Sequence, residues 1–77
     1  MKTTAYFREQ VLQKRPYLNL EICEDIITNH LQKEIQDDGR IRYWGFVAEL
    51  NKNIRVVVLE DGETIHNAFM DRNFKQS

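Results

Sequence analysis

The sequence is poor in residues that cross-link a chain or bind metals. It has one cysteine, Cys23, and two histidines, His30 and His66. A single cysteine excludes an internal disulfide and any zinc site built from several cysteines. No spacing motif joins the two histidines, so they give no metal-binding pattern. The sequence therefore predicts a domain without a metal or other cofactor.

Long apolar runs and a strong net charge are also missing. No run approaches the length of about 20 residues that spans a bilayer, and the opening MKTTAYFREQ lacks the apolar segment of a secretory signal. We therefore expect a cytoplasmic protein that has no membrane partner. The formal net charge is −1, which argues against non-specific coating of nucleic acid, because such binding sets several cations against phosphates. A local basic patch is still compatible with this net charge.

What is present is the composition of a short globular chain. Hydrophobic residues make up 42% of the 77 residues and charged residues 30%, which favours a folded domain over disorder. A chain of this length buries only about 60% of its unfolded surface. We expect one small α+β domain, residues 1–77, with its functional site on the surface or at a dimer interface.

Two helices are predicted in the first half of the chain. The first covers about residues 5–14, and Pro16 prevents it from continuing. Asn19 is a suitable N-cap for the second, at about residues 20–32, whose apolar residues recur at helical spacing. Residues 34–39 then predict a short extended piece and a turn.

The second half, from Ile41 to Met70, predicts a three-stranded antiparallel meander of IRYWGFVAEL, IRVVVLE and ETIHNAF. The pair Asp61-Gly62 predicts a two-residue type I′ turn, because both residues accept positive φ. The fold class is thus α+β, with two N-terminal helices packed on one face of a three- to four-stranded antiparallel β-meander.

The two predicted loops set the strand registers. The two-residue turn places Asn67 on the core face and Arg55 opposite Ala68 on the other. A three-residue loop at 51–53 places Glu49 opposite Arg55 and brings Trp44 to the core face. A one-residue slip would reverse both faces of a strand.

Under these registers Glu49, Arg55 and His66 share the less apolar face of the sheet, and they are the catalytic candidates. A carboxylate, a guanidinium and an imidazole suit phosphodiester transfer. One group takes the 2′-hydroxyl proton, one protonates the leaving oxygen, and the arginine stabilises the phosphorane charge. The alternative is a solvated face with an ordinary cross-strand ion pair.

Four residues are candidates for RNA binding: Arg40, Arg42, Trp44 and Arg72. Arginine combined with an aromatic ring suits phosphate contacts and base stacking. The first three alternate along one strand and would share a face. The alternative is that the ring packs in the core while the arginines remain solvated. Cys23 and Phe74 are expected to pack against the domain.

The layout of two helices, then a meander whose last strand carries a short polar motif, resembles the small bacterial toxins of the RelE/ParE and BrnT kind. The resemblance covers most of the chain, through the segments EICEDIITNHLQKEIQ, GRIRYWGFVAEL and IRVVVLEDGETIHNAFMDR. It implies a ribonuclease that acts freely or on the ribosome and is paired with an acidic antitoxin protein.

The sequence leaves two functions open. The first is a toxin-like RNA-binding or ribonuclease module. The second is a non-catalytic interaction domain that forms a homodimer. Apolar Val47, Val57 and Leu59 would otherwise be exposed to solvent together on the face away from the predicted core. An exposed edge strand can also pair with another chain. The two are distinguished by whether Arg55 and His66 share an open concave surface, and by whether a second chain buries those valines.

Overall fold

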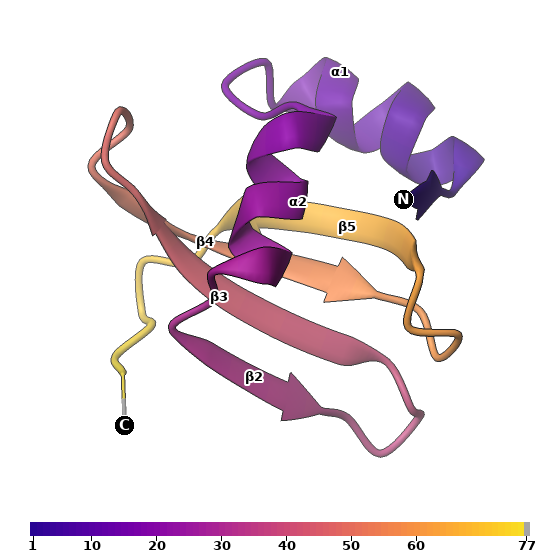
Figure 1. Cartoon of the computed structure of the whole chain (residues 1–77). Coiled ribbons are helices and arrows are strands. Elements are labelled where there is room, and N and C mark those ends of the chain that lie inside the picture. Colours follow the sequence, from indigo (N-terminus) through magenta and orange to yellow (C-terminus); the bar gives the residue numbers. More distant parts are fainter. Residues whose placement is uncertain (77) are drawn as a thin grey trace.

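The computed structural model describes residues 1–76 as two layers, a sheet and the helices that cover one face of it (Figure 1). The strands are β1 (Lys2–Thr3), β2 (Gln32–Ile35), β3 (Ile41–Val47), β4 (Lys52–Val58) and β5 (Thr64–Met70). Their order across the sheet is β1-β5-β4-β3-β2. Strands β2 to β5 form an antiparallel meander, and β1 pairs with β5 in parallel.

The α+β class is therefore confirmed, but the predicted sheet of three or four antiparallel strands needs correction. Within residues 1–76 the sheet has five strands and is mixed. The additional strand β1 is two residues long, too short to show the alternation by which strands are recognised. The short extended piece expected near residue 34 is the edge strand β2.

The helices are η1 (Phe7–Val11), a π-helical turn that continues into α1 (Leu12–Lys14), and the separate α2 (Leu20–Thr28). The first helix begins where Thr4 Oγ1 accepts the N–H of Phe7 at 3.0 Å. Asn19 caps α2 as predicted, since its Oδ1 accepts the N–H of Ile22 at 2.8 Å. Helix α2 ends earlier than predicted. Within residues 1–76 no helix has the length and apolar character needed to cross a bilayer.

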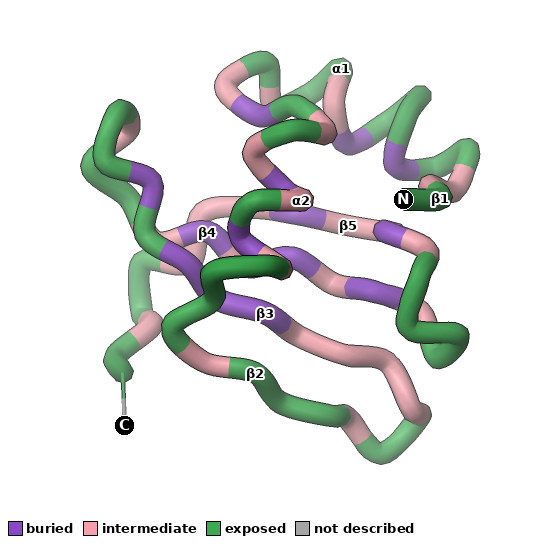
Figure 2. Tube along the Cα trace, in the orientation of Figure 1, coloured by how far each residue is buried: buried purple, intermediate pink, exposed green. Residues whose placement is uncertain are grey.

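All the helices pack on one face of the sheet, and the core lies between the two layers (Figure 2). The residues with no exposed surface come from both layers: Phe7, Val11, Cys23, Ile54, Val56, Val58, Ile65 and Ala68. Gly45 lets α2 approach β3, because a Cβ at this position would lie 3.1 Å from the Ile26 side chain. Burial, with a smaller contribution from Glu24, raises the pKa of the Cys23 thiol to about 12. Cys23 is therefore a core residue, as expected.

The turn between β4 and β5 differs from the predicted type I′ turn. The N–H of Leu59 donates to the carbonyl of Thr64 at 2.8 Å, so residues 60–63 form the loop. Gly62 has a φ of 72°, but Asp61 does not have a positive φ. Asp61 instead accepts the N–H of Thr64 on its side chain at 2.9 Å. The predicted two-residue loop is therefore wrong.

Strand β5 contains a β-bulge that changes the register within the strand. Val58 faces Ile65, but the preceding residue of β4, Val57, faces Asn67, so one residue of β5 is skipped. His66 is the extra residue of the bulge. Every residue of β5 after the bulge consequently lies on the opposite face from the predicted one.

Beyond the bulge, Arg55 faces Phe69 and Val56 faces Ala68. Ala68 is fully buried, whereas the prediction placed it on the other face. Asn67 lies away from the helices, and its predicted place in the core is wrong.

The register between β3 and β4 is also shifted. Val47 faces Lys52, and the hairpin turns through residues 48–51 rather than 51–53. Asn51 supplies the positive φ of that turn, 54°, a conformation that asparagine tolerates better than most residues. The shift is by an odd number of residues, so both faces of β3 are exchanged relative to the prediction. Trp44 faces Arg55 and lies outside the cluster that forms the core.

Candidate nucleic-acid interface

The face of the sheet away from the helices is the candidate site, and we call it the open face. No helix of residues 1–76 covers it (Figure 1). Its residues alternate with the core residues along the strands: Gln32, Glu34, Arg42, Trp44, Phe46, Asn53, Arg55, Val57, Asn67 and Phe69. The open face therefore combines two arginines, three aromatic rings and several amides.

Asp71, which follows β5, organises the centre of the open face. Its Oδ2 accepts the indole N–H of Trp44 at 2.9 Å. The same oxygen accepts from Arg55, at 3.2 Å from Nε and 2.8 Å from Nη2. The hydrogen bond from Trp44, and then the hydrogen bonds and charge of Arg55, hold the pKa of the Asp71 carboxyl below its usual range. Asp71 is thus a carboxylate at neutral pH and fixes both partners.

The guanidinium of Arg55 lies between two aromatic rings. Its central carbon is 5.4 Å from the ring centre of Trp44 and 4.9 Å from that of Phe69, within the range of cation–π attraction. On its other side Trp44 stacks against Phe74, with ring centres 5.2 Å apart and planes 11° from parallel. The expectation that Phe74 docks is confirmed, and the segment from Asp71 to Phe74 lies across Trp44 as a strap.

Arg42 lies at the other end of the open face, beside the edge strand. Its Nη1 donates to Glu34 Oε1 at 3.1 Å. With its amide oxygen turned towards Arg42, Gln36 accepts from Nη2 at 2.6 Å and from Nε at 3.1 Å. Arg42 is therefore held in place while part of its side chain stays in solvent, with 31% of its surface exposed.

A pocket of about 230 Å³ opens where β5 ends beside the β3–β4 hairpin. Its lining includes Lys52, Asn53, Arg72 and the half-exposed ring of Phe46. Neither Lys52 nor Arg72 forms an ion pair with another described residue. Asp71 also lines the pocket, but its charge is already neutralised by Arg55. The pocket thus presents two free cations.

The structure does not bring the three catalytic candidates together. Arg55 is on the open face, while Glu49 lies exposed in the turn between β3 and β4. His66 lies on the side of the first helix, where Thr4 Oγ1 is 3.0 Å from its Nδ1 and the ring of Tyr6 is 5.0 Å away, centre to centre. The predicted grouping depended on two registers that are wrong.

Of the four RNA-binding candidates, Arg42 and Trp44 share the open face and Arg72 lines the pocket at its edge. Arg40 precedes β3 and turns towards Asp38, with its Nε 3.9 Å from Oδ2. Trp44 is largely covered, with 5% of its surface exposed. No group of metal-binding side chains suited to hold an ion is found in residues 1–76.

Sequence reasoning missed the roles of several residues. Asp71 was not among the candidates, although it binds Arg55 and Trp44. Phe69 and Asn53 were not recognised because their faces depend on the correct registers. The only signal for Asp71 was its position directly after the last strand, which does not identify a partner.

Compared with protein families, curated proteins and solved structures, the chain matches none.

Proposed function

We propose that the domain binds single-stranded RNA on the open face of its sheet. The observation that carries the proposal is the stack of Arg55 between Trp44 and Phe69 on a face that no described helix covers. A guanidinium beside an accessible aromatic ring, here Arg55 beside Phe69, offers a base a stacking surface. Because Asp71 fixes Arg55, this surface is formed before any ligand arrives.

The pocket beside the hairpin extends this surface. Lys52 and Arg72 supply the unpaired positive charges that a phosphate needs. The ring of Phe46, 51% exposed at the same pocket, is available to stack on a base. We assign one phosphate of the bound strand to this pocket and the neighbouring bases to the open face.

The resemblance to RelE/ParE and BrnT toxins extends the proposal from RNA binding to a biological role. In this role the domain is the RNA-directed member of a bacterial toxin–antitoxin pair and acts in the cytoplasm on free or ribosome-bound RNA. The geometry supports binding more directly than cleavage, since His66 and Arg55 are apart. The support for this role is architectural: two helices cover one face of the meander of this chain, and Arg42 and Arg55 lie on its other face.

The test is a titration of a fluorescently labelled single-stranded RNA with the wild type, Arg42→Ala and Arg72→Ala, read by anisotropy. We expect each substitution to weaken binding by about three- to tenfold. Each should also reduce the slope of log affinity against log salt by about 0.7, the effect of one lost phosphate contact with a single strand.

Arg15→Ala is the matched control, because this substitution removes the same charge at a distant site. Arg15 lies on the helical side of the sheet, at the end of α1. Equal weakening by this control, or no binding of RNA by the wild type at low salt, would overturn the proposal. RNA cleavage or growth arrest that disappears in Arg42→Ala would add ribonuclease activity to it.

A homodimer formed through β2 is the second candidate function. Strand β2 pairs with β3 on one side only, and large apolar side chains lie exposed at its two ends, Leu31 at 43% and Ile35 at 67%. An antiparallel pairing of two copies centred on Lys33 sets each Leu31 opposite Ile35 of the other copy. This surface replaces the valine face predicted from the sequence, because Val47 is buried within its own chain.

Light scattering during size-exclusion chromatography tests the dimer. We expect a dimeric mass for the wild type and a monomeric mass for Ile35→Lys, because the added charge would face an apolar side chain. Lys75→Glu, at an exposed site beyond the sheet, is the control and should leave the mass unchanged. A monomeric wild type at high protein concentration would exclude this candidate.

A further inference from the structure

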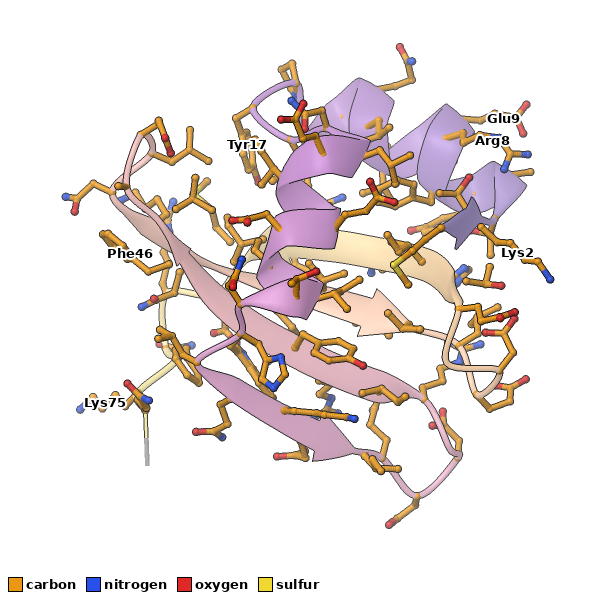
Figure 3. The ribbon with its side chains drawn as sticks, viewed as in Figure 1. Lys2, Arg8, Glu9, Tyr17, Phe46 and Lys75 are labelled. Atoms are coloured by element: carbon orange, nitrogen blue, oxygen red, sulfur yellow. The ribbon has the colours of Figure 1, made fainter. Side chains whose placement is uncertain are left out.

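A second groove lies on the helical side of the sheet, between α2 and the β3–β4 hairpin. It has a volume of about 740 Å³. Tyr17 and Phe46 lie on opposite sides of it (Figure 3). Its apolar lining comes from the segment before α2, from α2 and from the hairpin: Tyr17, Ile22, Phe46, Val47, Ala48 and Leu50. The groove thus presents apolar side chains that the chain itself leaves partly uncovered.

The charged residues of this groove all have the same sign. Glu21 and Asp25 project from α2, one turn apart, and Glu49 lies opposite them in the hairpin turn. No lysine or arginine lines the groove. Neither Glu21 nor Glu49 forms an ion pair with any other residue of the described chain. An occupant of this groove must therefore be apolar on the side that enters it and positively charged at its margins.

The surrounding backbone determines how such an occupant can bind. Strand β3 pairs with β4 along its length and with β2 from Ile41 to Trp44, so only residues 45–47 lie beyond the end of β2, a stretch too short to bind another strand. Helix α2 has its own internal hydrogen bonds. Contact must therefore be made through side chains, as when an amphipathic helix enters an apolar groove.

We infer that the groove between α2 and the β3–β4 hairpin binds a basic amphipathic helix of a partner protein. The apolar face of that helix packs on Ile22, Leu50 and Phe46. Lysine or arginine residues on its flanks meet the carboxylates of Glu21 and Glu49. This site lies on the helical side of the sheet and shares the ring of Phe46 with the pocket at the edge of the open face.

The inference is tested with a labelled synthetic helical peptide of about 14 residues, about 21 Å long, with leucine on one face and lysine on the other. Anisotropy measures its binding to the full chain. We expect saturable binding that Glu21→Lys/Glu49→Lys weakens by about tenfold or more, because repulsion replaces attraction at both margins. A peptide with glutamate in place of lysine should not bind.

Glu9→Lys/Glu60→Lys makes the same charge change at exposed positions outside the groove and is the matched control. Phe46→Ser removes an apolar contact without changing the charge, and should also weaken binding. Amide chemical-shift changes should be confined to α2 and residues 46–50. Equal weakening by the control pair, shift changes at open-face residues other than Phe46, or no saturable binding of the basic peptide would each overturn the inference.

Discussion

Asp71 shows how one carboxylate can hold a surface in place. It is 10% exposed and accepts hydrogen bonds from Trp44 and Arg55 on a single oxygen. An uncharged side chain at this position would leave Arg55 without its counter-charge between two rings. The residue therefore combines a structural role with the presentation of the arginine that we propose contacts RNA.

We predict that Asp71→Asn lowers the free energy of unfolding at pH 7 by about 1.5–3 kcal/mol, the usual value for hydrogen bonds to a charged group. The pKa of Asp71 is lowered in the folded state. Its contribution is therefore present above the ordinary value of 3.8 and is lost as pH falls through the folded-state pKa. Urea denaturation of both proteins at pH 7 and at pH 3 measures this.

Asp37→Asn, in the exposed turn before β3, is the control and should change stability little. A difference between wild type and Asp71→Asn that stays the same at both pH values would contradict the ion-pair role of Asp71.

Strand β5 shows where local sequence rules stop being sufficient. Regular alternation cannot place both Ile65 and Ala68 on the core face, because they are three residues apart. The bulge at His66 resolves this conflict and buries both. The adjacent polar pair, His66 and Asn67, between two apolar residues is the sequence signal of the bulge, and it becomes clear only once the core partners are known.

We predict opposite outcomes for two neighbouring substitutions in β5. Ala68→Asp places a charge in the core, where Ala68 has no exposed surface, and should prevent folding because an isolated buried charge is very costly. Asn67→Asp lies on the open face and should retain a cooperative thermal transition. Circular dichroism measures both. A folded Ala68→Asp together with an unfolded Asn67→Asp would favour the regular register.

Features that depend on a few neighbouring residues were predictable from the sequence. The cap at Asn19, the end of the first helix before Pro16 and the presence of the last three strands are of this kind. The strand registers were not predictable, because they depend on which side chains α2 buries. The candidate site had the same limit, since Arg42 and Arg55 were identified while their companions Asp71 and Phe69 were not.

At the scale of the whole molecule, the strap from Asp71 to Phe74 closes over the only tryptophan of the chain. The emission of Trp44 therefore reports directly on whether the strap is in place. Gln76 adds a contact beyond it, donating from Nε2 to the carbonyl of Leu31 at 3.3 Å. The strap covers one of the rings of the open face and leaves Phe69 and Phe46 accessible.

We predict that Phe74→Ala shifts the emission of Trp44 to longer wavelength and increases its quenching by acrylamide, because the ring that covers the indole is lost. The far-ultraviolet circular dichroism should not change, since Phe74 lies outside the strands and helices. Lys75→Ala, in the next residue, is the control. Unchanged quenching in Phe74→Ala would show that other residues shield Trp44.

The parallel pairing of β1 with β5 has a consequence for the order of folding. Successive strands of the meander are joined by short turns, whereas Lys2 faces Thr64 across most of the chain. Closing a longer loop costs more conformational entropy, and distant contacts slow folding. We therefore expect the meander to form first and β1 to join late. The strand that comes first in chain order within this sheet is then the last to pair.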